Sequence, residues 1–123
     1  MKILISVLIL GLSALLSISC NEEDEPDEFG VEARLTATPE TGTTITEFFF
    51  DASATETFGE WETIKYEWEF GDGSTSYQGA ETETHQYDQP GEYTVSVNVK
   101  IYKKDNQGSA GDIAEVLVQV DAE

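Results

Sequence analysis

Residues 66–74 read YEWEFGDGS, and this stretch decides the fold of the chain. Tyr66, Trp68 and Phe70 alternate with two glutamates, which is the pattern of a β-strand with one apolar and one solvated face. The alternation ends at Gly-Asp-Gly, which favours a hairpin because glycine adopts positive φ and aspartate bonds nearby amides. A phosphate-binding loop would need a following helix and usually a lysine, whereas residues 74–77 read STSY. The stretch therefore predicts a strand and the corner that follows it, not a catalytic or phosphate site.

Four further stretches read as strands, and helical spacing is hard to find. Apolar residues occupy alternate positions in residues 31–37, 93–101 and 116–120, and residues 45–50 (ITEFFF) are β-branched and aromatic. Each alternating strand has a dry face and a wet face, as in antiparallel sheets. About seven short strands in roughly a hundred residues are typical of a β-sandwich. We therefore predict an all-β fold whose two sheets close on the indole of Trp68.

Two sequence blocks resemble the signature of the PKD domain family. Residues 66–74 contain its W-x-F-G-D-G pattern, and residues 85–95 (HQYDQPGEYTV) contain its H-x-Y-x-x-P-G-x-Y-x-V pattern. Residues 50–53 (FDAS) match a shorter upstream step, so the resemblance covers residues 33–120. It implies an immunoglobulin-like antiparallel β-sandwich of about seven strands. Members of this family are mainly extracellular, non-catalytic modules that contact proteins or polysaccharides or that space other domains.

The resemblance implies a structural role, and no catalytic one, for ten motif residues. We expect His85 to pack or bond at a turn, and Tyr87 to be a corner tyrosine whose hydroxyl bonds backbone. Pro90 and Gly91 fit a type II turn, with glycine at the position that needs positive φ. The full set is Trp68, Phe70, Gly71, Asp72, Gly73, His85, Tyr87, Pro90, Gly91 and Tyr93.

The first twenty residues, MKILISVLILGLSALLSISC, have the layout of a secretory signal: a lysine, an uncharged apolar run and small residues at the cut. Cys20 resembles the lipidated cysteine of bacterial lipoproteins, although Ser17 stands where that family usually has leucine. An ordinary signal peptidase could use the same site. We expect a signal peptide at residues 1–19, lipid attachment at Cys20, and an acidic tether at residues 20–29 that is either a spacer or a surface-export signal. The domain would then occupy residues 30–123 of an exported protein anchored at the outer membrane or cell surface.

The charge of the chain excludes several partners. Its 25 acids and 6 bases give a formal net charge of −19, which argues strongly against nucleic acid and against adsorption to anionic lipid. Membrane contact is therefore expected through the lipid anchor only. A single cysteine rules out an intrachain disulfide. No cofactor or metal is expected, although the acids that follow Asp51 leave a weak calcium site open as a hypothesis.

The loop at residues 55–63 is the candidate binding site. Phe58 and Trp61 flank Gly59 and Glu60 there, and exposed aromatics on sandwich loops stack on sugars or anchor protein contacts. The alternative is that both rings fold back and cap the core. His85, the only histidine, has no nucleophile at a catalytic spacing, so we expect no enzyme. The expected function is a lipid-anchored surface module that makes protein or polysaccharide contacts; the alternative is an accessory subunit of a neighbouring surface complex.

Overall fold

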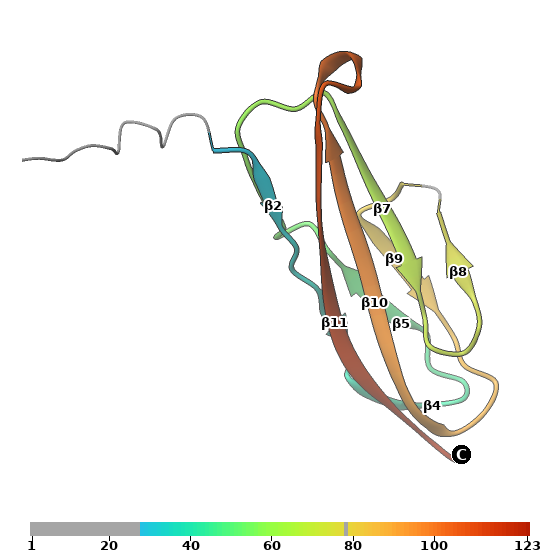
Figure 1. Ribbon diagram of the computed structural model, residues 1–123. Helices are drawn as coiled ribbons and strands as arrows, with labels where there is room; N and C mark the ends of the chain where they lie inside the picture. The colour runs from blue at the N-terminus through green and yellow to red at the C-terminus, as the bar shows by residue number, and fades with distance from the viewer. Residues whose placement is uncertain (1–27, 78) are drawn as a thin grey trace, which may run out of the picture.

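The computed structural model describes residues 28–77 and 79–123 as packed β-sheets (Figure 1). The predicted signal, Cys20 and the tether as far as residue 27 lie outside the described residues. The strands in chain order are β2 (Gly30–Glu32), β3 (Thr36–Thr38), β4 (Thr41–Thr43), β5 (Phe48–Asp51), β6 (Glu56–Phe58), β7 (Thr63–Glu69), β8 (Thr75–Ser76), β9 (Thr82–His85), β10 (Gly91–Tyr102) and β11 (Ser109–Asp121).

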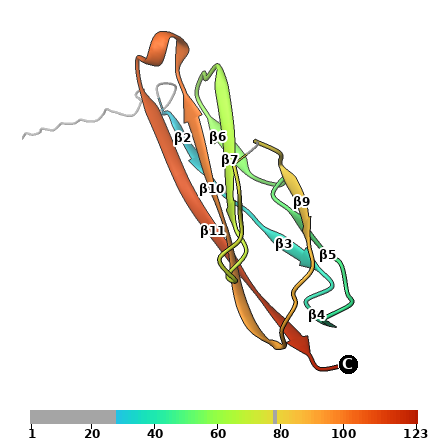
Figure 2. The ribbon, with the colours of Figure 1, turned by 90° about the vertical axis from the view of Figure 1, so that its right-hand side faces the viewer.

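The strands form two layers and a short flanking ribbon. One layer is a five-stranded sheet in the order β4-β11-β10-β7-β8, and the other is a three-stranded sheet in the order β3-β5-β9. Figure 2 shows β10 and β11 in one layer and β3, β5 and β9 in the other. β2 and β6 pair as a separate antiparallel ribbon. The all-β sandwich predicted from the sequence is confirmed.

The structure corrects three details of the prediction. The strand expected at residues 31–37 is two strands, β2 and β3, which pair in different sheets. The sandwich is not wholly antiparallel, because β4 pairs with β11 in parallel. Short strands that the sequence did not reveal also raise the count above seven.

Helical structure is slight in the described part of the chain. It consists of a single 3-10 turn, η2 (Lys104–Asn106), in the loop between β10 and β11. None of the described residues forms a helix long and apolar enough to cross a membrane.

The core lies between the two layers and is built from alternate residues of the long strands. Trp68 of β7 is fully buried, and its indole N–H donates a 2.8 Å hydrogen bond to the carbonyl of Ala80. Its ring stacks on Phe70 and tilts against Phe50 of the facing sheet. The other buried apolar residues are Ala37, Phe48, Ala52, Tyr66, Tyr87, Val95, Val97, Val99, Ile101, Val118 and Val120. The sheets therefore close on Trp68, as the sequence predicts.

Candidate functional site

The Gly-Asp-Gly segment is a structural corner between β7 and β8. The backbone N–H of Phe70 donates to the carbonyl of Ser74, and the carboxylate of Asp72 accepts the N–H of Ser74 at 2.9 Å. Gly71 has φ +91°, and a Cβ at this position would lie 2.7 Å from the carbonyl oxygen of Thr94. Only glycine allows β7 to turn this close to β10. The hairpin predicted from the sequence is confirmed.

The acid of this corner is joined to the second sequence block. Asp72 Oδ2 lies 2.8 Å from His85 Nε2, and the imidazole stacks on Phe70 with ring centroids 4.3 Å apart. Partial burial opposes the charge of Asp72, but hydrogen bonds from His85 and Ser74 outweigh it and lower the pKa of this carboxyl below its usual value. The histidine thus packs and bonds at a turn, as expected.

Two tyrosines complete the corner. The hydroxyl of the buried Tyr87 donates a 2.7 Å hydrogen bond to the carbonyl of Phe70, so Tyr87 is the corner tyrosine that we predicted. Burial, together with the nearby charge of Asp72, raises the pKa of Tyr87 well above that of a free tyrosine. Tyr93 stacks on Tyr87 and donates its hydroxyl to the carbonyl of Gln89. We refer to this cluster of Phe70, Asp72, His85, Tyr87 and Tyr93 as the closed end.

The turn predicted at Pro90 and Gly91 is wrong in type. Gly91 is the first residue of β10, and its φ of +151° is far from the value of about +80° that a type II turn requires. The chain enters β10 in an extended conformation instead. The glycine keeps its backbone role, because a φ of this sign is rare for other residues.

The acids after Asp51 do not converge. The carboxylate of Asp51 accepts the N–H of Ser53, and bonds from Ser53 lower its pKa despite a small opposing effect of burial. Glu56 faces Arg34 at 3.5 Å. Across residues 28–77 and 79–123, no group of three or more acidic, histidine or cysteine side chains is arranged to hold a metal ion. The described geometry therefore gives the calcium hypothesis no ligand set.

The two aromatic residues predicted to bind lie at the opposite end of β7. Phe58 is the last residue of β6 and Trp61 lies in the bend before β7, so only Trp61 is in a loop. Their side chains are 36% and 39% exposed, so neither ring is buried in the core. The indole N–H of Trp61 donates a 2.9 Å hydrogen bond to the hydroxyl of Thr57, which fixes the ring at the surface.

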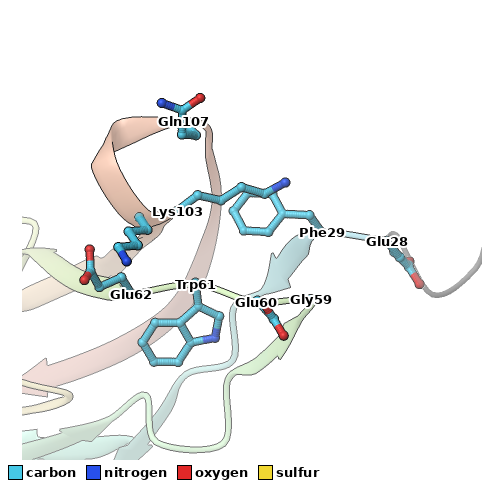
Figure 3. A pocket seen from close by; sticks show the side chains of 9 residues that line it. Glu28, Phe29, Gly59, Glu60, Trp61, Glu62, Lys103 and Gln107 are labelled. Atoms are coloured by element: carbon cyan, nitrogen blue, oxygen red, sulfur yellow. The ribbon is translucent and has the colours of Figure 1, made fainter.

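Trp61 lines an open depression of about 800 Å³ (Figure 3). Phe29 and Lys103 line it from other parts of the chain, and the Lys103 ammonium lies 4.6 Å from the centre of the Phe29 ring. Phe58 is not among the lining residues. We call this depression the open-end hollow; its lining consists of Glu28, Phe29, Gly59, Glu60, Trp61, Glu62, Lys103, Lys104 and Gln107.

Gly59 explains how the hollow is assembled. Its φ is +82°, and a Cβ there would lie 2.5 Å from the carbonyl oxygen of Glu28 and 3.2 Å from Phe29 Cα. The glycine therefore lets residues 28–29 lie against the loop that carries Trp61. Sequence reasoning missed Phe29, because its place in the hollow depends on this tertiary approach; the one signal was an aromatic residue immediately after the acidic run.

The family of the chain follows from these elements. The PKD domain family matches residues 32–120, which include both sequence blocks and the whole closed end. The chain belongs to the PKD domain family. A PKD domain is non-catalytic by itself. In this chain the motif residues form hydrogen bonds with one another, His85 with Asp72 and Tyr87 with Phe70. No curated protein matches the chain.

Solved structures extend the comparison. This PKD domain is similar to a structure described as addressing the promiscuous specificity of carbohydrate-binding modules from the β-sandwich superfamily, with 28% identity and a TM-score of 0.61. The match covers 76% of this chain but 35% of that one, so the chain spans about a third of its length.

Two further similar structures are themselves PKD domains. The PKD domain of an M14-like peptidase from Thermoplasmatales archaeon SCGC AB-540-F20 is 20% identical, with a TM-score of 0.55, and the match covers 76% of this chain and 96% of that one. The PKD1 domain of the metalloprotease PrtV from Vibrio cholerae is 21% identical over the same shares, with a TM-score of 0.47. The archaeal structure supports the PKD-like sandwich fold.

Proposed function

We propose that this PKD domain is a non-catalytic, lipid-anchored module of the cell surface that binds a polysaccharide at the open-end hollow. The observation that carries the proposal is the position of Trp61, whose indole is held at the surface by Thr57 and which is one of the residues that line an open depression. A rigid exposed indole offers a large apolar area at little entropic cost, which suits the apolar face of a sugar ring. Other lining residues, Glu60, Glu62 and Gln107, carry polar groups that can take up sugar hydroxyls.

Two further points support a sugar as the ligand. The hollow is lined by Glu28, Glu60, Glu62, Lys103 and Lys104, a mixture of charges that fits a neutral ligand better than a polyanion. In addition, a structure 28% identical to this chain is described as that of carbohydrate-binding modules.

The test is a glycan array probed with the full chain. We expect Trp61→Ala to weaken binding to the best glycan by at least about tenfold, because truncating an anchoring aromatic typically costs more than about 1.4 kcal/mol. Tyr77→Ala is the matched control, since Tyr77 is also an exposed aromatic (61%) but does not line the hollow. Equal losses in both variants, or an absence of glycan binding by the wild type, would reject the proposal.

The anchor is tested separately. Metabolic labelling with palmitate should mark the wild type and should disappear in Cys20→Ser. Labelling that persists in the variant would remove the lipid anchor at Cys20 from the proposal and leave the sugar site standing.

A further inference from the structure

Among the described residues, one edge of β11 has no partner strand over most of its length. β11 pairs with β10 from Ser109 to Val120, but on its other side β4 reaches only Gln119–Asp121. The register shows which residues face that side. The N–H of Lys103 donates to the carbonyl of Gly108, so even-numbered residues of β11 bond to β10 and odd-numbered residues point away. The N–H of Gln119 confirms this, because it donates to Glu40 beside β4.

Ile113, Glu115 and Leu117 therefore direct their backbone N–H and C=O groups outward. None of the hydrogen bonds formed among residues 28–77 and 79–123 uses these groups. The nearby segment after β2 does not pair with them, since the N–H of Ala33 donates to the side chain of Asp112 instead. An unpaired edge of this kind is a template for an added strand.

The side chains of the same three residues form a short exposed stripe. Ile113 and Leu117 are 57% and 55% exposed, and Glu115 lies between them on the same face. Their partners on β10 are the polar residues Asn98, Ser96 and Thr94, so no side chain of β10 offers them an apolar cover. The edge thus carries an apolar, an acidic and an apolar side chain at three alternate positions, Ile113, Glu115 and Leu117.

We propose that this edge of β11 binds an extended segment of another protein, which adds as a strand and places a basic residue opposite Glu115 between two apolar residues. Backbone hydrogen bonds would supply the attachment, and the alternate side chains the specificity. The negative charge of this surface favours a basic segment. The formal net charge of the chain is −19, and Ser96 of β10 pairs with Glu115 on one side and with Glu69 on the other, so that two glutamates lie in one row across the sheet.

A second copy of the chain fits the edge poorly. In the centred antiparallel register, Ile113 would meet Leu117 of the other copy, but Glu115 would lie directly opposite Glu115. Like charges directly opposite each other destabilise a strand pair, and a charge on an exposed edge is a common device against self-pairing. Glu115 therefore favours a basic partner and disfavours homodimers.

The first measurement is amide hydrogen exchange of the full chain, solubilised in mild detergent. Without a ligand, the amides of Ile113, Glu115 and Leu117 should exchange fast while their even-numbered neighbours exchange slowly. The probe is a seven-residue peptide, Thr-Val-Thr-Lys-Thr-Val-Thr, which offers valine, lysine and valine at alternate positions. At saturation we expect it to slow exchange at the three outward amides by at least tenfold. A peptide with glutamate in place of the lysine should bind about fivefold more weakly.

Two variants separate the backbone from the charge. Glu115→Pro removes an outward N–H without breaking the ladder to β10, so we expect the peptide to lose its protection of the edge. Glu115→Lys keeps the backbone and should reverse the preference, so that the glutamate peptide binds more tightly. Trp61→Ala should leave peptide binding unchanged, which makes this edge independent of the open-end hollow.

Three outcomes would overturn the proposal. These are unchanged exchange at the three amides up to millimolar peptide, equal affinity for the lysine and glutamate peptides, and slow exchange at these amides without peptide in a protein that sediments as a dimer. The last result would identify a second copy as the occupant.

Discussion

The closed end and the open-end hollow lie beyond opposite ends of β7 and are built by opposite rules. At the closed end, Asp72, His85 and Tyr87 each have a partner within the domain, and the rings of His85 and Tyr87 meet edge to face. At the open end, Trp61 makes one hydrogen bond and keeps 39% of its surface in solvent. The motif residues of this PKD domain therefore hold the sandwich together, while the exposed Trp61 lies outside the motif.

The two tryptophans give the sharpest contrast. We expect Trp68→Ala to lower the free energy of unfolding by about 3–5 kcal/mol, because it empties the centre of the core. Against a typical total of about 5–15 kcal/mol, the variant would be unfolded or close to it. Trp61→Ala should lower it by about 1 kcal/mol, through one lost surface hydrogen bond. Urea unfolding followed by circular dichroism measures both; similar losses would erase the distinction between the two ends.

Glycine substitutions at the β7–β8 corner come next in size. Gly71 and Gly73 both have positive φ, but a Cβ on Gly71 would strike backbone of β10, whereas one on Gly73 meets no atom within 4 Å. We expect Gly73→Ala to cost about 1 kcal/mol and Gly71→Ala about 3 kcal/mol. The midpoints of urea unfolding report the difference, and a Gly73→Ala loss as large as that of Gly71→Ala would argue against close approach as the cause.

The corner hydroxyl has a smaller effect. Tyr87→Phe leaves the buried carbonyl of Phe70 without its donor, so we expect a loss of about 1–3 kcal/mol. Tyr93→Phe is the control, because its hydroxyl bonds Gln89 in an exposed position and should cost less, about 0.5 kcal/mol. Thermal unfolding of both variants distinguishes a buried from an exposed bond, and the reverse order would contradict the account of the corner.

The smallest expected effect is on the free energy of unfolding at acidic pH. The pKa of Asp72 is lower in the folded than in the unfolded protein, so its ionisation stabilises the fold above the unfolded value of about 3.9. That stabilisation is lost as the pH falls through the folded pKa. Between pH 6 and pH 3, the gap in unfolding free energy between wild type and Asp72→Asn should therefore narrow. A gap that stays constant for Asp72→Asn between pH 6 and pH 3 would exclude the linkage.

The long strands and the closed end could be predicted because their signals are local. Alternation over seven or more residues identifies one face of β7 and of β10, and Gly-Asp-Gly identifies the corner from its own conformational needs. The core position of Trp68 follows from the phase of the same alternation.

The rest depends on contacts between distant residues. β4, β6, β8 and β9 are two to four residues long, too short for a period of two to be visible. β11 begins at Ser109, where Gly111 and Asp112 suggest a turn, because pairing with β10 outweighs their low strand propensity. Phe29 joins the hollow only because Gly59 admits it, and the unpaired edge of β11 is a matter of register.

The position of Glu28 at the rim of the hollow limits where this protein can work. If Cys20 carries a lipid, seven residues lie between the anchor and Glu28, and the eight Cα-to-Cα steps reach at most about 29 Å when fully stretched. The end of the domain that carries Glu28 would then stay close to the headgroup layer, and Figure 1 shows the C-terminus at the opposite end of the sandwich from β2. Under the proposed function, the sugars within reach would be those displayed close to the bilayer itself, such as glycolipid headgroups or polymers that lie flat on the membrane.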